Sequence, residues 1–220
     1  MQLSLVANGY AAAALLFATA PLNYVDYRDA LAAGTELFKQ GFVQRSVESF
    51  DRAEELKPSL ARYFWQRGIS QYYDKQYVEC YNQFSTDAEV SKADAEELLW
   101  GFLCRAGTGG DIARAQRALQ STKVAVDPRG VMVNAQRLYR GEISSDDMLN
   151  LYASQRGDRD FFYSRLYVSL FEAAGGYTTA AEEHVKDALA SAYAGSGSGR
   201  DYMVDVATIQ LKALQNSLNK

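Results

Sequence analysis

The single histidine, His184, limits the chemistry that this 220-residue chain can support. A nucleophile relay needs a serine or cysteine and a carboxylate that converge on such a base. Glu182, Glu183 and Asp187 are near in sequence, but both cysteines are far away and no strand–turn–helix nucleophile motif is present. We therefore predict a core or groove histidine that donates to a carbonyl or carboxylate. An enzyme that uses His184 is the alternative.

The sequence also lacks motifs for metals and cofactors. One histidine and two widely separated cysteines give no zinc-binding spacing. The acidic pairs at 96–97 and 146–147 do not reproduce a calcium loop. The glycine-rich segments 107–110 and 195–199 lack the Lys-Ser/Thr ending of a phosphate-binding loop. We expect no cofactor, no metal site and no enzymatic activity.

The two cysteines, Cys80 and Cys104, leave the redox compartment open. Both occupy helical positions beside apolar neighbours, so we predict buried free thiols. A disulfide between them in an oxidising lumen is the alternative, because the sequence cannot show that they meet.

Composition favours an all-α globular chain. Hydrophobic residues make up 48%, charged residues 23%, and three prolines leave room for long helices. The net charge of −4 and a pI near 5.1 argue against a nucleic-acid partner, which usually requires a clustered basic face. The arginines between 105 and 129 are interleaved with Asp111 and Asp127, so we predict a solvated face of mixed charge.

Residues 3–22 contain no charged side chain. At about 1.5 Å per residue, such a stretch is just long enough to cross a bilayer core. It lacks a basic flank, and its A-x-A sequence at 18–20 is followed at once by Pro21. We predict a targeting or anchoring segment at 1–25 with membrane contact through 3–22, and a helical domain at 26–220. A buried first helix is the alternative. The targeting interpretation favours an extracytoplasmic or organellar lumen over the cytosol.

An internal repeat of 34 residues aligns 30–58 with 64–92. Glycine in the first helix of each unit lets the second helix approach, a small residue on the second helix faces it, and a phenylalanine fills the space between pairs. A further small residue and a helix-ending proline complete the first unit. The positions that define the repeat are Gly34, Ser46, Phe50, Ala53 and Pro58, followed by Gly68, Cys80 and Phe84. The second unit has Asp87 and Lys92 in place of the last two, so we predict that its second helix ends early or turns differently.

Beyond residue 94 the repeat decays, and helices remain the prediction. The segment 95–106 is apolar around most of its circumference, as a central buried helix would be. We predict shorter helices at 112–122, 131–139 and 145–154, and a clear helix pair with Ser169 as its close-contact position. That pair comprises 159–174 and 178–192. A flexible link at 194–199 then leads to a capping helix at 201–218, which covers the apolar end of the array.

The first unit, with GTELFKQGFVQRSVESFDRAEELKP, resembles the tetratricopeptide repeat. At longer range the chain is similar to NlpI-like tetratricopeptide proteins of bacteria and plastid-bearing organisms. The stretches SLARYFWQRGISQYY, EELLWGFLCRA, DPRGVM and HVKDALASAYAGSGSGRDYMVDVA carry this likeness. The resemblance implies a right-handed α-solenoid of antiparallel helix pairs, with degenerate middle repeats and a C-terminal capping helix.

Clustered aromatic residues indicate a binding surface. Consecutive aromatics cannot all face one core on a helix that turns about 100° per residue. In this fold the first helices of the units line the concave groove, so we predict partner contacts from Arg62, Tyr63, Gln66, Arg67 and Gln71. The expected function is a non-enzymatic scaffold that grips a peptide or the subunit of a membrane complex. The resemblance favours a subunit or assembly factor of a thylakoid complex, and the alternative is an NlpI-like adaptor that presents substrates to a protease.

Overall fold

The computed structural model describes residues 22–90, 94–123, 127–196 and 201–218, and within 86–90 only the backbone. These residues form helices and turns and no strand, which confirms the all-α prediction. Within the same ranges, no helix combines the length and the apolar character needed to cross a bilayer. The predicted targeting segment lies almost entirely outside the described residues.

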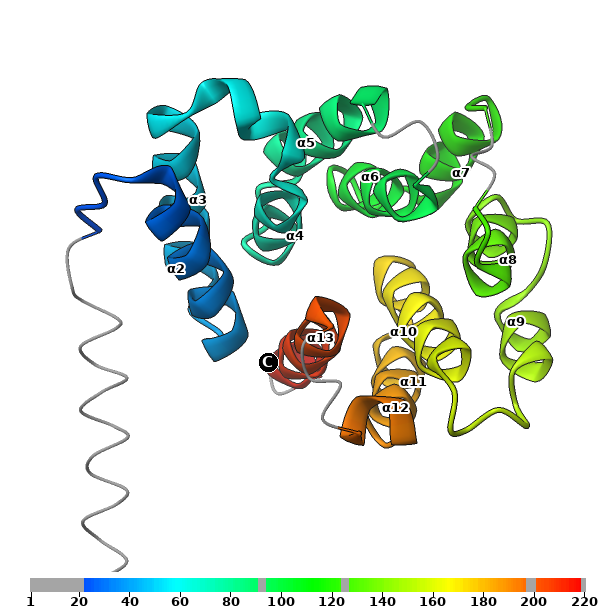
Figure 1. The fold of residues 1–220 in the computed structure, drawn as a ribbon. Helices are drawn as coiled ribbons and strands as arrows, with labels where there is room; N and C mark the ends of the chain where they lie inside the picture. The colour runs from blue at the N-terminus through cyan, green and yellow to red at the C-terminus, as the bar shows by residue number, and fades with distance from the viewer. Residues whose placement is uncertain (1–21, 91–93, 124–126, 197–200, 219–220) are drawn as a thin grey trace, which may run out of the picture.

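Successive helices pack as adjacent pairs and follow an arc (Figure 1). In chain order they are α2 (Tyr27–Gln40), α3 (Val43–Leu56), the 3₁₀ helix η1 (Pro58–Tyr63), α4 (Trp65–Tyr73), α5 (Tyr77–Val90), α6 (Ala95–Gly107), α7 (Ile112–Gln120), α8 (Gly130–Tyr139), α9 (Ser145–Leu151), α10 (Arg159–Ala174), α11 (Thr178–Leu189), α12 (Ala192–Gly195) and α13 (Tyr202–Leu218).

Local sequence signals set the limits of the first helices. The Asp26 carboxylate accepts a hydrogen bond from the Arg28 backbone N–H at 2.7 Å and caps α2. Gly41 ends that helix with φ of 89°, a left-handed conformation that favours glycine. Helix α3 ends two residues before Pro58, which begins η1. Helices α3 and α5 both have 14 residues, so α5 does not end early, and the alternative of a different turn falls on residues 91–93, outside the described residues.

Close approach within the first two pairs depends on their glycines. A Cβ at Gly34 would lie 3.0 Å from the Phe50 ring, and one at Gly68 would lie 2.6 Å from the Phe84 ring. The Ser46 hydroxyl donates to the Gly34 carbonyl at 2.7 Å. Ser46 thereby ties the second helix of its unit to the first, at the point where the glycine allows the backbones to meet.

The disulfide between Cys80 and Cys104 joins α5 to α6. Its two Cα atoms are 5.7 Å apart, which is an ordinary separation for a disulfide, and both side chains are fully buried. The prediction of free thiols was therefore wrong. The apolar neighbours that suggested inert buried thiols are those of a helix–helix contact, in which the two cysteines face each other.

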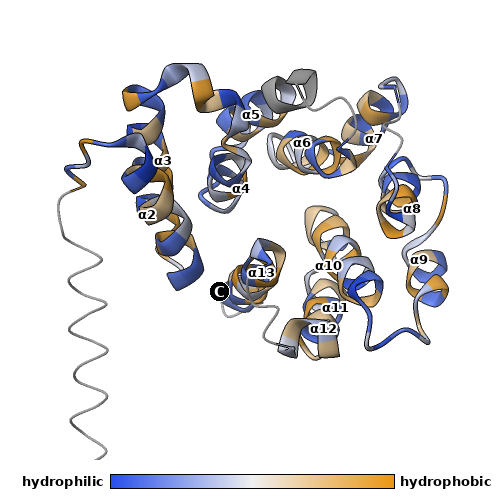
Figure 2. Ribbon diagram, in the orientation of Figure 1, coloured by the Kyte–Doolittle hydropathy of each residue, from blue (hydrophilic) through white to orange (hydrophobic). Residues whose placement is uncertain are grey.

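Two helices form the centre of the body. In α6 the buried side chains include Leu99, Trp100 and Leu103. In α10 all ten residues from 161 to 170 are buried, and the helix is largely orange in Figure 2. Helix α10 packs on α11, α8 and α6. The sequence analysis identified α6 as central and did not foresee that α10 is enclosed even more completely.

The C-terminal helix closes the arc on itself. Helix α13 packs chiefly on α11 and also touches α2, so the first and last described helices lie side by side (Figure 1). The Tyr202 ring stacks on Phe38 at a centroid distance of 5.3 Å and meets Trp65 edge-on at 5.2 Å. The Tyr73 hydroxyl donates to the Gln210 side chain at 3.0 Å. The predicted capping helix thus also covers the inner side of α2 and α4.

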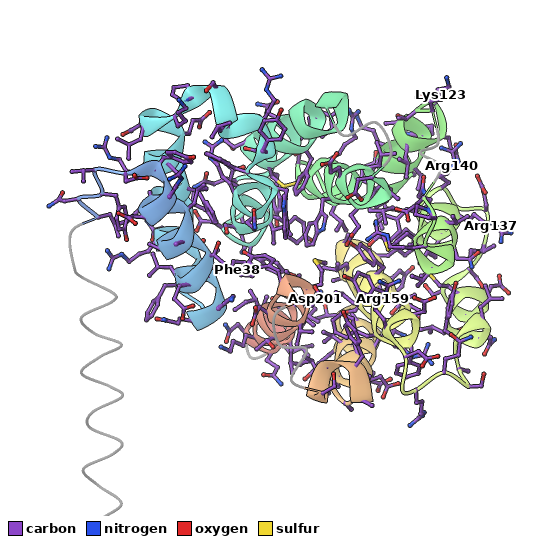
Figure 3. All side chains as sticks on the ribbon, viewed as in Figure 1. Phe38, Lys123, Arg137, Arg140, Arg159 and Asp201 are labelled. Carbon is purple, nitrogen blue, oxygen red and sulfur yellow. A yellow bond between two sulfur atoms is a disulfide. The ribbon has the colours of Figure 1, made fainter. Side chains whose placement is uncertain are left out.

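Basic side chains gather at the outer edge of the arc, where Figure 3 shows Lys123, Arg137 and Arg140. The Arg140 guanidinium donates to the carbonyls of Leu119 at 2.7 Å and Gln120 at 3.1 Å. These carbonyls belong to the last turn of α7, where the helix dipole favours a positive charge. Arg140 therefore stabilises the end of α7 and the junction with α8.

Candidate binding surfaces

The structure divides the five predicted partner residues between two surfaces. Arg62 and Tyr63 end η1 and are exposed, whereas Gln66, Arg67 and Gln71 belong to α4. Helix α4 does line the inner side of the arc, but α13 covers part of that side. The five residues therefore do not form a single open groove.

The first surface, here called the N-terminal groove, lies between α2, α3, η1 and α4 and encloses about 300 Å³. None of its nine lining residues carries a charge. The Tyr63 side chain at its edge is 55% exposed, a large value for an aromatic residue. The lining residues are Tyr27, Leu31, Ala32, Thr35, Phe50, Leu60, Tyr63, Phe64 and Gln66.

The second surface, the polar groove, has a volume of about 240 Å³ and includes Arg62, Arg67 and Gln71. The Arg67 guanidinium lies 2.7 Å from both the Asp51 and the Glu54 carboxylates. Gln71 is buried. Arg67 therefore ties α4 to α3, and its charge is already matched within the chain.

A third surface, the central pocket, lies where α4, α5 and α6 face α10 and α13, and its volume is about 280 Å³. Aromatic rings and carboxylates alternate around it. Its lining residues are Trp65, Phe84, Asp94, Glu96, Glu97, Trp100, Tyr163, Asp201 and Met203. Sequence reasoning missed this pocket because its walls come from five helices that are spread over 139 positions of the chain.

A polar network fixes one wall of the central pocket. Arg129 contacts Glu96 at 2.5 Å, Asp127 at 2.7 Å and Asp94 at 3.1 Å. The Tyr167 hydroxyl donates to the other oxygen of Glu96 at 2.6 Å. Arg129 is half-buried within this network, so the prediction that it belongs to a solvated mixed face was wrong. The resemblance stretches EELLWGFLCRA and DPRGVM meet here, which their separation in sequence did not reveal.

The network shifts the pKa values of its carboxyl groups in opposite directions. Burial raises the pKa of Glu96 above its ordinary value, and the Tyr167 hydroxyl and the Arg129 charge offset this effect only in part. Burial also acts to raise the pKa of Asp127, but its hydrogen bonds with Arg129 outweigh burial, so this pKa is lowered. Burial raises the pKa of Tyr163 and Tyr167 well above the ordinary range, and both phenols stay protonated donors.

His184 faces Glu172 of α10, with 3.3 Å between its Nε2 atom and the carboxylate. None of the three acidic residues near it in sequence is its ion-pair partner among the described residues. In the described part of the chain, no group of three or more His, Cys, Asp and Glu side chains could hold a metal ion. This contact links α11 to α10.

Comparison of the whole chain with models of protein families and with curated proteins gives no match. The geometry of the surfaces is therefore the basis for a functional conclusion.

Proposed function

We propose that this protein is a non-enzymatic scaffold that holds a protein partner in its N-terminal groove. In this proposal the chain is a tetratricopeptide-like right-handed solenoid. It serves as a subunit or assembly factor of a larger membrane-associated complex, of which a thylakoid photosynthetic complex is one example. The observation that carries the proposal is the uncharged lining of the groove, together with the exposure of Tyr63 at its edge.

The lining selects the chemistry of the partner. Burial of apolar surface contributes roughly 25 cal/mol per Å², and aromatic anchors dominate the energy of protein interfaces. Because all nine lining residues are uncharged, a charged segment would lose its hydration here without gaining an ion pair. A short peptide with apolar or aromatic side chains fits best. Its contacts would include Tyr63 and Gln66 of the predicted set, and Arg62 lies one residue from the edge of the groove.

The test compares two exposed tyrosines. Tyr63 lies at the groove, and Tyr177, which is 69% exposed, begins α11 in another part of the body. The wild type, Tyr63→Ala and Tyr177→Ala would each be used for affinity isolation from membranes of the source cells, followed by identification and quantification of the bound proteins. We expect one stoichiometric partner with the wild type and Tyr177→Ala, and loss of at least nine-tenths of it with Tyr63→Ala.

Equal recovery of that partner with folded Tyr63→Ala would show that the groove does not hold it. A protease recovered as the stoichiometric partner would favour the adaptor function over the structural one. Partner recovery that is abolished by His184→Ala alone, with the fold intact, would contradict the groove as well.

A further inference from the structure

The central pocket is chemically unlike the N-terminal groove, because it combines large aromatic walls with a surplus of carboxylates. Its apolar lining residues include Trp65, Trp100, Phe84 and Met203. Phe84 and Trp100 stack at a centroid distance of 6.0 Å. Four of the nine lining residues are Asp or Glu, and none is Lys or Arg. A lining with four acidic and no basic side chains favours a cationic guest over an anionic one.

The carboxylates are neutralised unequally. Arg129 forms ion pairs with Asp94 and Glu96 of the pocket lining. It also pairs with Asp127, which does not line the pocket. Asp201 at the beginning of α13 has only uncharged donors: the hydroxyl of Tyr193 at 2.6 Å, the backbone N–H of Met203 at 2.9 Å and the hydroxyl of Tyr163 at 3.0 Å. Within the part of the chain that the structure describes, no basic side chain forms an ion pair with Asp201.

These hydrogen bonds hold the Asp201 carboxylate in place at the inner side of the arc, where Figure 3 labels it. Burial raises the pKa of Tyr193 to about 12, and the hydrogen bond to Asp201 adds to the effect. Tyr193 and Tyr163 therefore remain hydrogen-bond donors to the Asp201 carboxylate at neutral pH. A carboxylate held in place in a pocket that two tryptophans also line is an arrangement suited to organic cations.

We propose that the central pocket binds an organic cation, namely an ammonium or guanidinium group on an apolar stem. The cationic head pairs with Asp201, and the stem packs between Trp65, Trp100 and Met203. At about 280 Å³ the pocket is slightly smaller than the sites of drug-sized ligands, which are about 300–1,000 Å³, so it suits a guest the size of one side chain. Metal ions need several oxygen or nitrogen ligands at short range. The described residues offer no such group, and aromatic walls favour the organic cation.

This inference does not depend on the N-terminal groove. The groove and the pocket share no lining residue, so either proposal can fail alone. The guest's cationic group could come from a Lys or Arg side chain of a protein or from a free polyamine, and the experiment distinguishes these two sources.

Intrinsic fluorescence is a specific readout for this pocket, because both tryptophans of the chain line it. The full chain would be titrated with a capped glycine–arginine–glycine tripeptide, with the same tripeptide carrying citrulline in place of arginine, and with spermidine. Citrulline has the shape of arginine without its charge. We expect a saturable fluorescence change with the arginine peptide or with spermidine, and at least tenfold weaker binding of the citrulline peptide.

The tighter of the two cationic probes identifies the source, a protein side chain or a free amine, and both results support the pocket. The proposal is wrong if arginine and citrulline peptides bind equally. It is equally wrong if neither the arginine peptide nor spermidine gives a saturable change up to about 10 mM, where binding would be worth less than about 3 kcal/mol.

Variants locate the site. Asp201→Asn removes the charge at nearly constant volume and should weaken binding of the cationic probe about tenfold, whereas Asp146→Asn, at an exposed position of α9, should leave it unchanged. Trp65→Leu, followed by calorimetry, should weaken binding about threefold because a ring face is lost. Folding would be checked by circular dichroism. If Asp201→Asn does not fold, Trp65→Leu decides, and wild-type affinity in a folded variant at either position would overturn the proposal.

Discussion

The two regular helix pairs, α2–α3 and α4–α5, and the returning segment α10–α13 are both buried helical structure, but they are held together differently. In the regular pairs, glycines and small residues at fixed spacing bring the helix backbones into contact, and Phe50 and Phe84 pack directly on those glycines. In the returning segment, tyrosine hydroxyls and stacked rings join residues that are far apart in sequence, such as Tyr167 with Glu96 and Tyr202 with Phe38. Steric fit dominates the first region, and long-range polar and aromatic contacts dominate the second.

The largest expected effect lies in the steric region. Phe50 is fully buried against Gly34, so Phe50→Ala should lower the free energy of unfolding by about 3–5 kcal/mol. Urea unfolding followed by circular dichroism would measure it. Exposed Glu48 on the same helix is the matched control, and Glu48→Ala should change stability by less than about 0.5 kcal/mol. A Phe50→Ala effect below about 1 kcal/mol would mean that the fit at Gly34 is not what holds the pair.

The disulfide connects the steric region to the rest of the body and should have the next largest effect. Cys80 and Cys104 are 24 residues apart, and the double change Cys80→Ser with Cys104→Ser should lower the free energy of unfolding by about 3 kcal/mol. Thermal unfolding of the wild type with and without a reductant would give a second measurement. Identical unfolding of the oxidised wild type and the double variant would contradict this role.

The polar network around Glu96, which Tyr167 connects to the returning segment, should respond to loss of Arg129. Arg129→Met retains much of the side-chain volume but removes the cation from three carboxylates, and we expect a loss of about 1–3 kcal/mol at pH 7 because the site is only half-buried. The lowered pKa of Asp127 makes its contribution fully present above its ordinary value of 3.8 and lost as the pH falls through the folded-state pKa. The difference between wild type and variant, measured by urea unfolding, should therefore be constant above about pH 5 and shrink as the pH falls below 3.8. If the stability difference does not change with pH, the pairing of Arg129 with Asp127 is not its cause.

The smallest expected effect concerns Glu96, whose pKa is shifted in the opposite direction to that of Asp127. Because burial raises its pKa, its contribution to stability is fully present below its ordinary value of 4.5 and is lost as the pH rises through the raised folded-state pKa. Unfolding free energies of the wild type relative to Glu96→Gln should therefore decrease as the pH rises above 4.5. An increase over that range would show that the Arg129 charge outweighs burial at this carboxyl.

The first region was predictable from sequence in considerable detail. The 34-residue spacing identified Gly34, Ser46 and Phe50, and in the structure the Ser46 hydroxyl and the Phe50 ring both contact the backbone at Gly34. The limits of the helix at 159–174 were also predicted to the residue, and the Gly175-Gly176 turn follows it. Such signals act within one helix or one helix pair, where the separation of two residues along the chain fixes their relative position in space.

The candidate sites were less predictable. The five residues expected to form one partner surface lie on two, because one side of η1 and α4 faces α2 whereas the other faces α5. The central pocket gave no sequence signal, because Trp65 and Asp201 are separated by more than half the chain. A surface built by distant helices depends on how the arc curves, and curvature sums small angles over many helix contacts that no local pattern specifies.

The sequence by itself determined that this chain is helical, where most of its helices begin and end, and which small residues bring the first pairs together. Caps, glycines and apolar spacing act over a few residues, so they can be recognised in the sequence alone. Only the tertiary structure decided that Cys80 meets Cys104, that Arg129 enters a buried network, and that α13 closes the arc against α2. Each of these contacts depends on the relative placement of whole helices, which is settled by burying the apolar faces of all of them at once.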